Sequence, residues 1–179
     1  IRGDPSGAIM YTADITSPTG FRYERVGLNV IHGIEAARGR RVRAWLGDRS
    51  VHDGHLPELV GPQRLLGGRE LGLFPPFDRL EVEVADGVVV QMVFEGDEFE
   101  MEDQRNYGDG SFKTYSTPLQ RPGPFVLPAG SAFRQSLTIR VRDTVPEVGS
   151  SGRHRAPAAD GRSESVVRLR DATAGTLPP

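Results

Sequence analysis

The sequence predicts an all-β protein, an antiparallel β-sandwich with long loops, and three observations carry that prediction. Short runs alternate apolar and polar residues with a period of two, which is typical of strands with one buried face. Glycine (22 residues) and proline (14 residues) punctuate these runs. Helical periodicity is weak, and only residues 34–40 favour a turn of helix. We expect eight to ten strands in all.

The first half of the chain contains three predicted strands and a predicted hairpin. Residues 8–15, 21–31 and 41–46 each alternate apolar with polar side chains. Asp53 and Gly54, between Val51 and Leu56, form a dipeptide that favours a tight hairpin turn. The proline- and glycine-rich segment that follows, residues 57–77, predicts a long irregular loop.

The second half contains a clearer hairpin and the closing strand. Residues 80–84 alternate, Asp86 and Gly87 predict the turn, and residues 88–95 return as the partner strand. Residues 99–106 and 112–115 are further predicted strands, and residues 132–142 close the β-sandwich domain, which we place at residues 1–143. Residues 144–179 are rich in Gly, Ser, Ala, Pro and Arg, which predicts a flexible, disordered C-terminal tail or linker.

Chemically active side chains gather between Phe94 and Tyr115. Lys113, which lies in this stretch, is the only lysine among 22 basic residues, and the other 21 are arginine. This pattern indicates that position 113 needs the compact charge of an ammonium group rather than a planar guanidinium. The same stretch holds five closely spaced carboxylates, those of Asp97, Glu98, Glu100, Glu102 and Asp103.

An extended strand over residues 99–106 would divide these groups between two faces. Glu100, Glu102, Gln104 and Asn106 would share the outer face, whereas Asp103 and Arg105 would begin on the core side and form a buried pair. Carboxylates and amides bind vicinal hydroxyl groups, and aromatic rings cover the apolar face of a sugar. The pattern therefore favours a polyhydroxylated ligand. A solvated acidic strand balanced by a surface lysine is the alternative.

The predicted site has three catalytic candidates and a ring of binding residues. Glu102 is the expected general base, Lys113 the group that stabilises an oxyanion, and His32 a proton shuttle, although a satisfied edge histidine explains His32 equally well. The expected substrate-binding residues are Glu100, Asp103, Arg105, Asn106, Tyr107, Asp109 and Tyr115.

Composition argues against several other functions. The formal charge of −2 favours neither nucleic acid nor an anionic membrane as a partner. No apolar run approaches the length of a membrane span, and the absence of cysteine excludes thiol chemistry and is compatible with a cytoplasmic location. His52 and His55 lack a third ligand nearby, so we expect no metal site, and no motif indicates a cofactor.

Four segments resemble one known family. FEGDEFEMEDQRNYGDGSFKTYSTPL (residues 94–119), RYERVGLNVIHG (22–33), PPFDRLEVEV (75–84) and AFRQSLTIRV (132–141) are similar, in the same order, to segments of the D-apionate lactonase family of bacterial sugar-acid catabolism. The sequence departs from the family pattern at Gly33, Tyr107 and Gly110, where the family has proline, tryptophan and alanine.

The resemblance implies a β-rich region that precedes a barrel-type domain, and nothing in these 179 residues resembles the barrel. We therefore expect a fragment or a short member of the family, which begins at Ile1 rather than at methionine. Two functions follow from this interpretation. The chain is either a hydrolase domain that opens a sugar-derived lactone to its acid, or a non-catalytic carbohydrate-recognition module that orients the sugar for the missing barrel.

Overall fold

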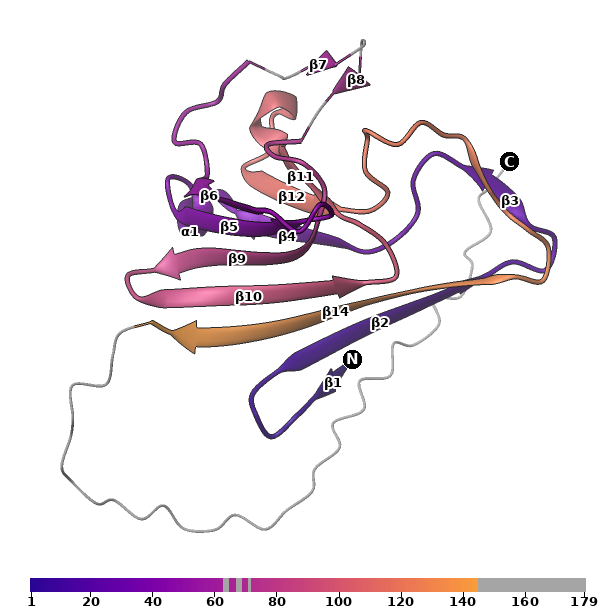
Figure 1. Cartoon of the computed structure of the whole chain (residues 1–179), viewed down its shortest axis with the longest axis horizontal. Helices are drawn as coiled ribbons and strands as arrows, with labels where there is room; N and C mark the ends of the chain where they lie inside the picture. Colours follow the sequence, from indigo (N-terminus) through magenta and orange to yellow (C-terminus); the bar gives the residue numbers. More distant parts are fainter. Residues whose placement is uncertain (63–64, 67–68, 71, 145–179) are drawn as a thin grey trace, which may run out of the picture.

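A computed structural model describes residues 1–62, 65–66, 69–70 and 72–144, and within these ranges the predicted all-β antiparallel architecture is confirmed (Figure 1). The predicted tail, apart from Thr144, lies outside the described residues. The strands, in chain order, are β1 (Arg2–Gly3), β2 (Ile9–Thr16), β3 (Phe21–Tyr23), β4 (Asn29–Gly33), β5 (Arg41–Leu46), β6 (Val51–His55), β7 (Leu65–Leu66), β8 (Arg69–Glu70), β9 (Phe77–Ala85), β10 (Val88–Glu95), β11 (Glu100–Asp103), β12 (Ser111–Tyr115), β13 (Phe125–Leu127) and β14 (Ala132–Asp143). The described helices are α1 (Ile34–Ala37) and the 3-10 turn η1 (Gln104–Tyr107). Neither has the length or apolar composition that crossing a bilayer requires.

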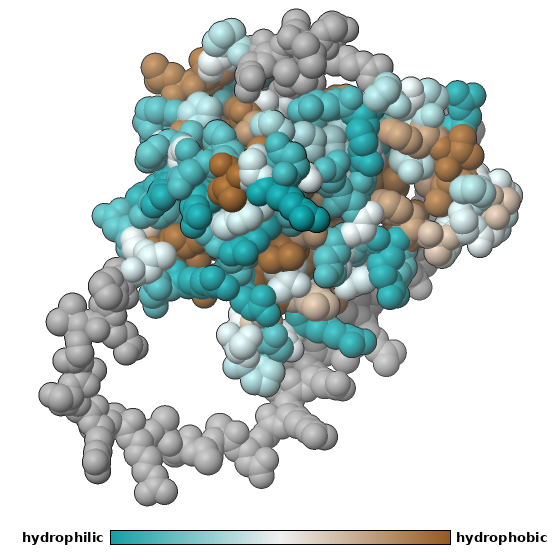
Figure 2. All heavy atoms as spheres, viewed as in Figure 1, coloured by the Kyte–Doolittle hydropathy of each residue, from teal (hydrophilic) through white to brown (hydrophobic). Residues whose placement is uncertain are grey.

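The larger layer is a seven-stranded sheet in the order β1-β2-β14-β10-β9-β5-β6. The β9–β10 hairpin turns at the predicted Asp86 and Gly87, where glycine adopts a φ of 74° that other residues rarely accept. Alternation then separates the two faces of this sheet. Leu80, Val82 and Met92 are buried against the second layer, and the opposite face is polar. Figure 2 shows hydrophilic side chains over most of the molecule in this view, and apolar ones gathered where β3 and β13 pair.

The second layer is a three-stranded sheet in the order β11-β12-β4, and its inner face forms the core with the larger sheet. Phe99, Met101 and Phe112 are fully buried there. Phe99 stacks on Phe94 with ring centroids 4.3 Å apart, and its backbone exchanges two hydrogen bonds with Phe77, of 2.9 and 2.8 Å. This bridge joins the two layers just where β11 begins.

The predicted strand over residues 21–31 is divided into β3 and β4, and a glycine between them explains why. Gly27 has a φ of 146°, and a Cβ atom there would lie 2.3 Å from the side-chain oxygen of Gln135. That oxygen accepts a 2.7 Å hydrogen bond from the backbone N–H of Leu28. The close approach anchors the start of β4 to β14, and the alternating pattern alone did not reveal the break.

The hairpin turn predicted at Asp53 and Gly54 was wrong. Both residues lie within β6, which pairs with β5 from His55 opposite Arg41 to Val51 opposite Trp45. The turn lies instead at residues 47–50, where Oδ1 of Asp48 accepts hydrogen bonds from the backbone N–H (2.9 Å) and the hydroxyl (2.5 Å) of Ser50. The predicted loop over residues 57–77 contains the short pair β7–β8 among its described residues.

Replacing Phe99 by alanine tests the bridge between the layers. The substitution leaves a cavity between Phe94 and Phe77, so Phe99→Ala should lower the free energy of unfolding by about 3–5 kcal/mol in urea denaturation. Val126→Ala is the control, because Val126 is 63 % exposed and its loss should change stability by less than about 0.5 kcal/mol. Equal effects of the two substitutions would contradict the assignment of Phe99 to the core.

Candidate functional site

The outer face of the three-stranded sheet brings four of the sequence-predicted residues together. In the antiparallel β11–β12 pair, Glu102 lies opposite Lys113 and Glu100 lies opposite Tyr115. Residues two apart along a strand share a face, so all four side chains lie on the same side of the sheet, away from Phe112 and Met101. The sheet register alone therefore assembles this group, which we call the outer-face cluster.

Glu102 and Lys113 face each other without a direct ion pair. No salt bridge within 4.0 Å joins them, and an amide stands between them instead. Gln104 donates through Nε2 to Oε2 of Glu102 (2.6 Å) and accepts through Oε1 from Nζ of Lys113 (3.4 Å). Glu102 is 7 % exposed and Lys113 is half-buried. The carboxylate and the ammonium group are thus neighbours held slightly apart by one side chain.

Two cations lie near the ring of Tyr115, whose hydroxyl group is unsatisfied. The ammonium of Lys113 and the guanidinium carbon of Arg25 each lie 5.3 Å from the centroid of its ring. The residue is 4 % exposed, and its buried hydroxyl has no hydrogen-bond partner. Burial, and then the nearby carboxylates of Glu100 and Glu102, raise the pKa of this phenol well above its usual value. The hydroxyl is therefore a neutral donor.

Glu100 is committed to holding loops. Its carboxylate is fully buried and accepts hydrogen bonds from the backbone N–H of Gly72 and, at 2.6 Å, from that of Leu119. Burial raises the pKa of Glu100, and these backbone donors oppose that rise. The side chain ties the segments at Gly72 and Leu119 over the outer face, so its two oxygens are occupied before any ligand arrives.

Asp103 and Arg105 form the buried pair that the sequence predicts. The carboxylate of Asp103 accepts from Nε (2.8 Å) and Nη2 (2.7 Å) of Arg105, whose pKa these bonds raise. Arg105 also donates to the backbone oxygens of Pro57 and Glu58, both at 2.9 Å, and lies over the ring of Phe112. The pair clamps the segment at Pro57 to the end of β11, and most donors of Arg105 are used in doing so.

The alternation predicts a strand that continues to Asn106, but the strand ends earlier. β11 ends at Asp103, whose Oδ1 accepts from the backbone N–H of Arg105 (3.1 Å) and caps η1. Asn106 therefore points elsewhere and donates weakly to the backbone oxygen of Asp103 (3.3 Å). Tyr107 is 54 % exposed, and Asp109 is exposed and accepts from the hydroxyl of Ser111 (3.1 Å). These three residues form a rim at the end of the sheet, outside the outer-face cluster.

His32 lies on the opposite face of the same sheet. It pairs with Phe112 across β4–β12, and its Nε2 lies 2.9 Å from the hydroxyl oxygen of Thr114 on the core side. Burial lowers the pKa of His32 to about 4. The ring lines an apolar hollow of about 240 Å³ between the two layers, together with Val82 and Met92. The structure thus does not bring His32 to Glu102 or Lys113. His32 shares a face with its partner Phe112, and Lys113, the next residue of β12, faces the opposite way.

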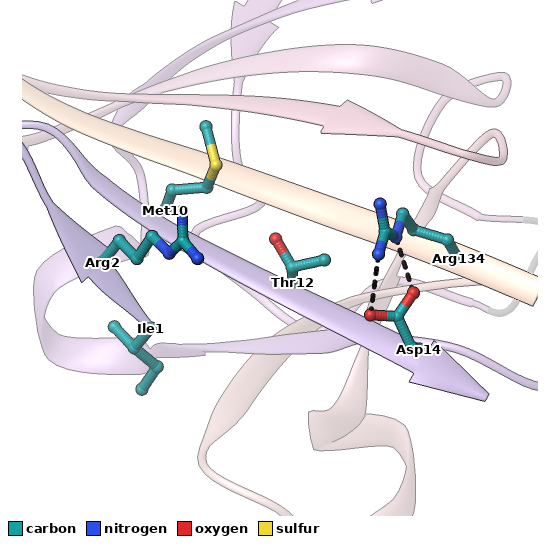
Figure 3. Close-up of a pocket in the computed structure, with 6 residues that line it drawn as sticks. All are labelled: Ile1, Arg2, Met10, Thr12, Asp14 and Arg134. Atoms are coloured by element: carbon teal, nitrogen blue, oxygen red, sulfur yellow. Dashed lines mark hydrogen bonds and ion pairs between the residues drawn. The ribbon is translucent and has the colours of Figure 1, made fainter. Parts of the chain in front are cut away.

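A second hollow, of about 270 Å³, lies on the polar face of the larger sheet near the N-terminus. Figure 3 shows Arg134 of β14 bound to Asp14 of β2 in this hollow, through contacts of 2.6 and 3.0 Å. None of the predicted site residues lines it. Within the described ranges, no three His, Asp or Glu side chains are grouped so that they could hold a metal ion.

Two residues that the predicted site did not include contact the outer-face cluster. Gln104 connects Glu102 to Lys113 only because η1 turns it back over the sheet. Arg25 reaches Tyr115 across a separation of 90 residues, which no local pattern encodes. The alternation placed Gln104 on the outer face but gave it no role in the site, and no signal in the sequence distinguishes Arg25 from other surface arginines.

Comparison with known proteins gives one family and one curated relative. The family described as "D-apionate lactonase, N-terminal domain" matches residues 1–144. A D-apionate lactonase from Brucella anthropi is 31% identical over 181 residues, which cover 99% of this chain and 27% of the relative. The chain thus spans about a quarter of the length of that relative. No solved structure matches.

The Asp103–Arg105 clamp predicts a large difference between two aspartates. Asp103→Asn leaves a mostly buried guanidinium without its counter-charge and should cost about 3 kcal/mol or more of unfolding free energy. Asp14→Asn removes a bidentate arginine contact of the same kind at an exposed site and should cost less than about 1 kcal/mol. Urea denaturation of both variants measures the difference, and similar costs would argue against the clamp.

The burial of His32 predicts a specific loss of stability in acid. The imidazole titrates near 6.5 in the unfolded chain and near 4 in the folded one, so the unfolded state binds more protons between these values. The free energy of unfolding should therefore fall by about 3 kcal/mol as the pH drops from about 6.5 to about 4. His32→Gln should abolish most of this dependence, and His55→Gln, at an exposed position, should retain it. Identical pH profiles for His32→Gln and the unsubstituted chain would rule the prediction out.

Proposed function

Because the chain belongs to the family of the D-apionate lactonase N-terminal domain, we propose that it acts in the hydrolysis of a sugar-derived lactone. The outer-face cluster is its proposed contact with the sugar. The curated relative is named a D-apionate lactonase, so the lactone of D-apionate is the first substrate to test. A place in sugar-acid catabolism, which the resemblance suggests, and a cytoplasmic location, with which the absence of cysteine is compatible, are further parts of this proposal.

One observation supports the proposal above the others. A carboxylate, an amide, an ammonium group and a phenol lie side by side on one sheet face, and the hydroxyl of the phenol has no partner. A sugar presents hydroxyl groups that both donate and accept, so it could bind Glu102 and Gln104 as an acceptor pair and satisfy the hydroxyl of Tyr115. A structural role alone gives no reason to leave that hydroxyl unsatisfied in the interior.

Ring opening assigns one role to each member of the facing pair. Glu102 takes a proton from water, and the water oxygen bonds to the lactone carbonyl carbon. The resulting oxyanion lies next to the ammonium of Lys113, which stabilises it. The bond from that carbon to the ring oxygen then breaks, and the alkoxide takes up the proton held by Glu102. We assign no proton transfer to His32, because it faces the core.

Recognition without catalysis is the second candidate, and the position of His32 favours it. The proton shuttle that the sequence predicts is absent from the cluster, and most of the length of the relative lies outside the match. In this case Glu102 and Tyr115 hold the sugar, and a barrel-type domain elsewhere in the polypeptide completes the chemistry. The rim formed by Asn106, Tyr107 and Asp109 would then contact the sugar or that domain.

A single assay separates these functions. The chain is titrated with the lactone of D-apionate, and proton NMR follows both binding and the formation of the open acid. Ring opening above the rate in buffer supports the hydrolase, and saturable binding without ring opening supports the recognition module. Absence of saturable binding would contradict both.

Lys113→Ala tests the role of the ammonium group. If Lys113 stabilises the oxyanion, its removal should lower the rate of ring opening by about 10²–10³-fold, which corresponds to about 3–4 kcal/mol. Arg142→Ala is the matched control, because Arg142 is an exposed cation near the far end of β14 and should leave the rate unchanged. An undiminished rate in Lys113→Ala would remove lysine from the mechanism.

A further inference from the structure

Two cations converge on one aromatic ring without carboxylate partners. Arg25, from the segment between β3 and β4, and Lys113, from β12, each lie 5.3 Å from the ring centroid of Tyr115. Among the described residues, no carboxylate lies within 4.0 Å of either charged group, although many other arginines are paired in this way. Since both cations share one centroid, their separation cannot exceed twice that distance.

The nearby acids form no ion pair with either cation and are hydrogen-bonded to other groups instead. The oxygens of Glu100 accept from the backbone N–H groups of Gly72 and Leu119, and Oε2 of Glu102 accepts from Gln104. Cation–π attraction to the ring offsets some of the repulsion between the two cations. An anion between the cations would stabilise both of them directly.

The hydroxyl group of Tyr115 is the second, independent observation. It is buried without a hydrogen-bond partner, which is unfavourable unless another group binds there. A ligand that carries an anionic group next to a hydroxyl group would satisfy both the cations and the phenol. An aldonate has this arrangement, because its carboxylate carbon is bonded to a carbon that bears a hydroxyl.

We infer that Arg25, Lys113 and the hydroxyl of Tyr115 form a binding site for the carboxylate and adjacent hydroxyl of an aldonate, the open acid that lactone hydrolysis produces. This inference rests on the proposed function and deepens it. The carbon that carries the oxyanion during ring opening becomes the carboxylate carbon of the product, so Lys113 contacts the same end of the ligand before and after the reaction. The site therefore prefers the acid to an uncharged analogue of equal size.

Threonate and threonamide are the probes, since they differ only in replacing the carboxylate with a neutral amide. Calorimetric titration of the 179-residue chain should show threonate binding about tenfold or more tightly than threonamide, with the preference shrinking as salt increases. Arg25→Gln and Lys113→Gln should each weaken threonate binding about tenfold and leave threonamide binding within about twofold. Arg142→Gln is the charge-matched control and should alter neither.

Tyr115→Phe separates ligand binding from folding. Removal of an unsatisfied buried hydroxyl should not lower the stability of the free chain, yet it should weaken both threonate and threonamide several-fold. Loss of stability together with unchanged affinity would show that the hydroxyl has only a structural role, and would overturn its part in the site.

The results distinguish a failure of the anion site from a failure of the proposed function. If the chain binds threonamide and the lactone of D-apionate but shows no preference for threonate, the anion site is wrong and the proposed function stands. If Arg25→Gln and Lys113→Gln weaken both probes equally, the anion site is likewise wrong. If neither the probes nor the lactone bind, the proposed function fails together with the inference.

Discussion

The register between β11 and β12 is the constraint on which the site depends. It sets Glu102 opposite Lys113 and Glu100 opposite Tyr115, and it sends Met101 and Phe112 into the core. A slip of one residue would exchange the faces and bury the charged groups between the layers. The bridge between Phe99 and Phe77 holds the start of β11 against the larger sheet by two backbone hydrogen bonds, next to the point where its pairing with β12 begins. The same register thus determines both the apolar core on one face of the sheet and the polar cluster on the other.

The acidic residues of β11 differ in their hydrogen-bond partners, and therefore in their roles. Glu100 and Asp103 have structural partners. Glu100 accepts hydrogen bonds from backbone N–H groups of two loops, and Asp103 pairs with Arg105. Both would be costly to leave unpaired, since a buried carboxylate without partners is strongly disfavoured. Glu102 differs, because its described contact is with a neutral amide rather than a cation. Glu102 and Lys113 are therefore neighbouring charged groups that can interact with a ligand.

The sequence predicted the fold class and part of the site for identifiable physical reasons. Period-two alternation and the Asp86–Gly87 turn are local signals, and the structure confirms the all-β architecture and that hairpin. The Asp103–Arg105 pair was also predicted, but from a strand over residues 99–106; the strand ends at Asp103, and the pair forms because η1 returns Arg105 to that carboxylate. The break at Gly27, the turn at Asp48 and the contact of Arg25 with Tyr115 depend on partners that local alternation cannot reveal. His32 illustrates the remaining difficulty, since its face is decided by its pairing with Phe112 across a separation of 80 residues.

Whether the Lys113 side chain contacts a sugar-derived ligand can be measured directly, because of the composition of the chain. Lys113 is the only lysine, so a sample labelled with ¹⁵N at lysine Nζ gives a single side-chain ammonium resonance. Titration with the lactone of D-apionate and with its open acid should shift that resonance saturably. We expect the larger shift for the acid, because its carboxylate would contact the ammonium group itself. A resonance that stays unmoved up to saturating ligand, while backbone amides elsewhere respond, would contradict the placement of the site on this face.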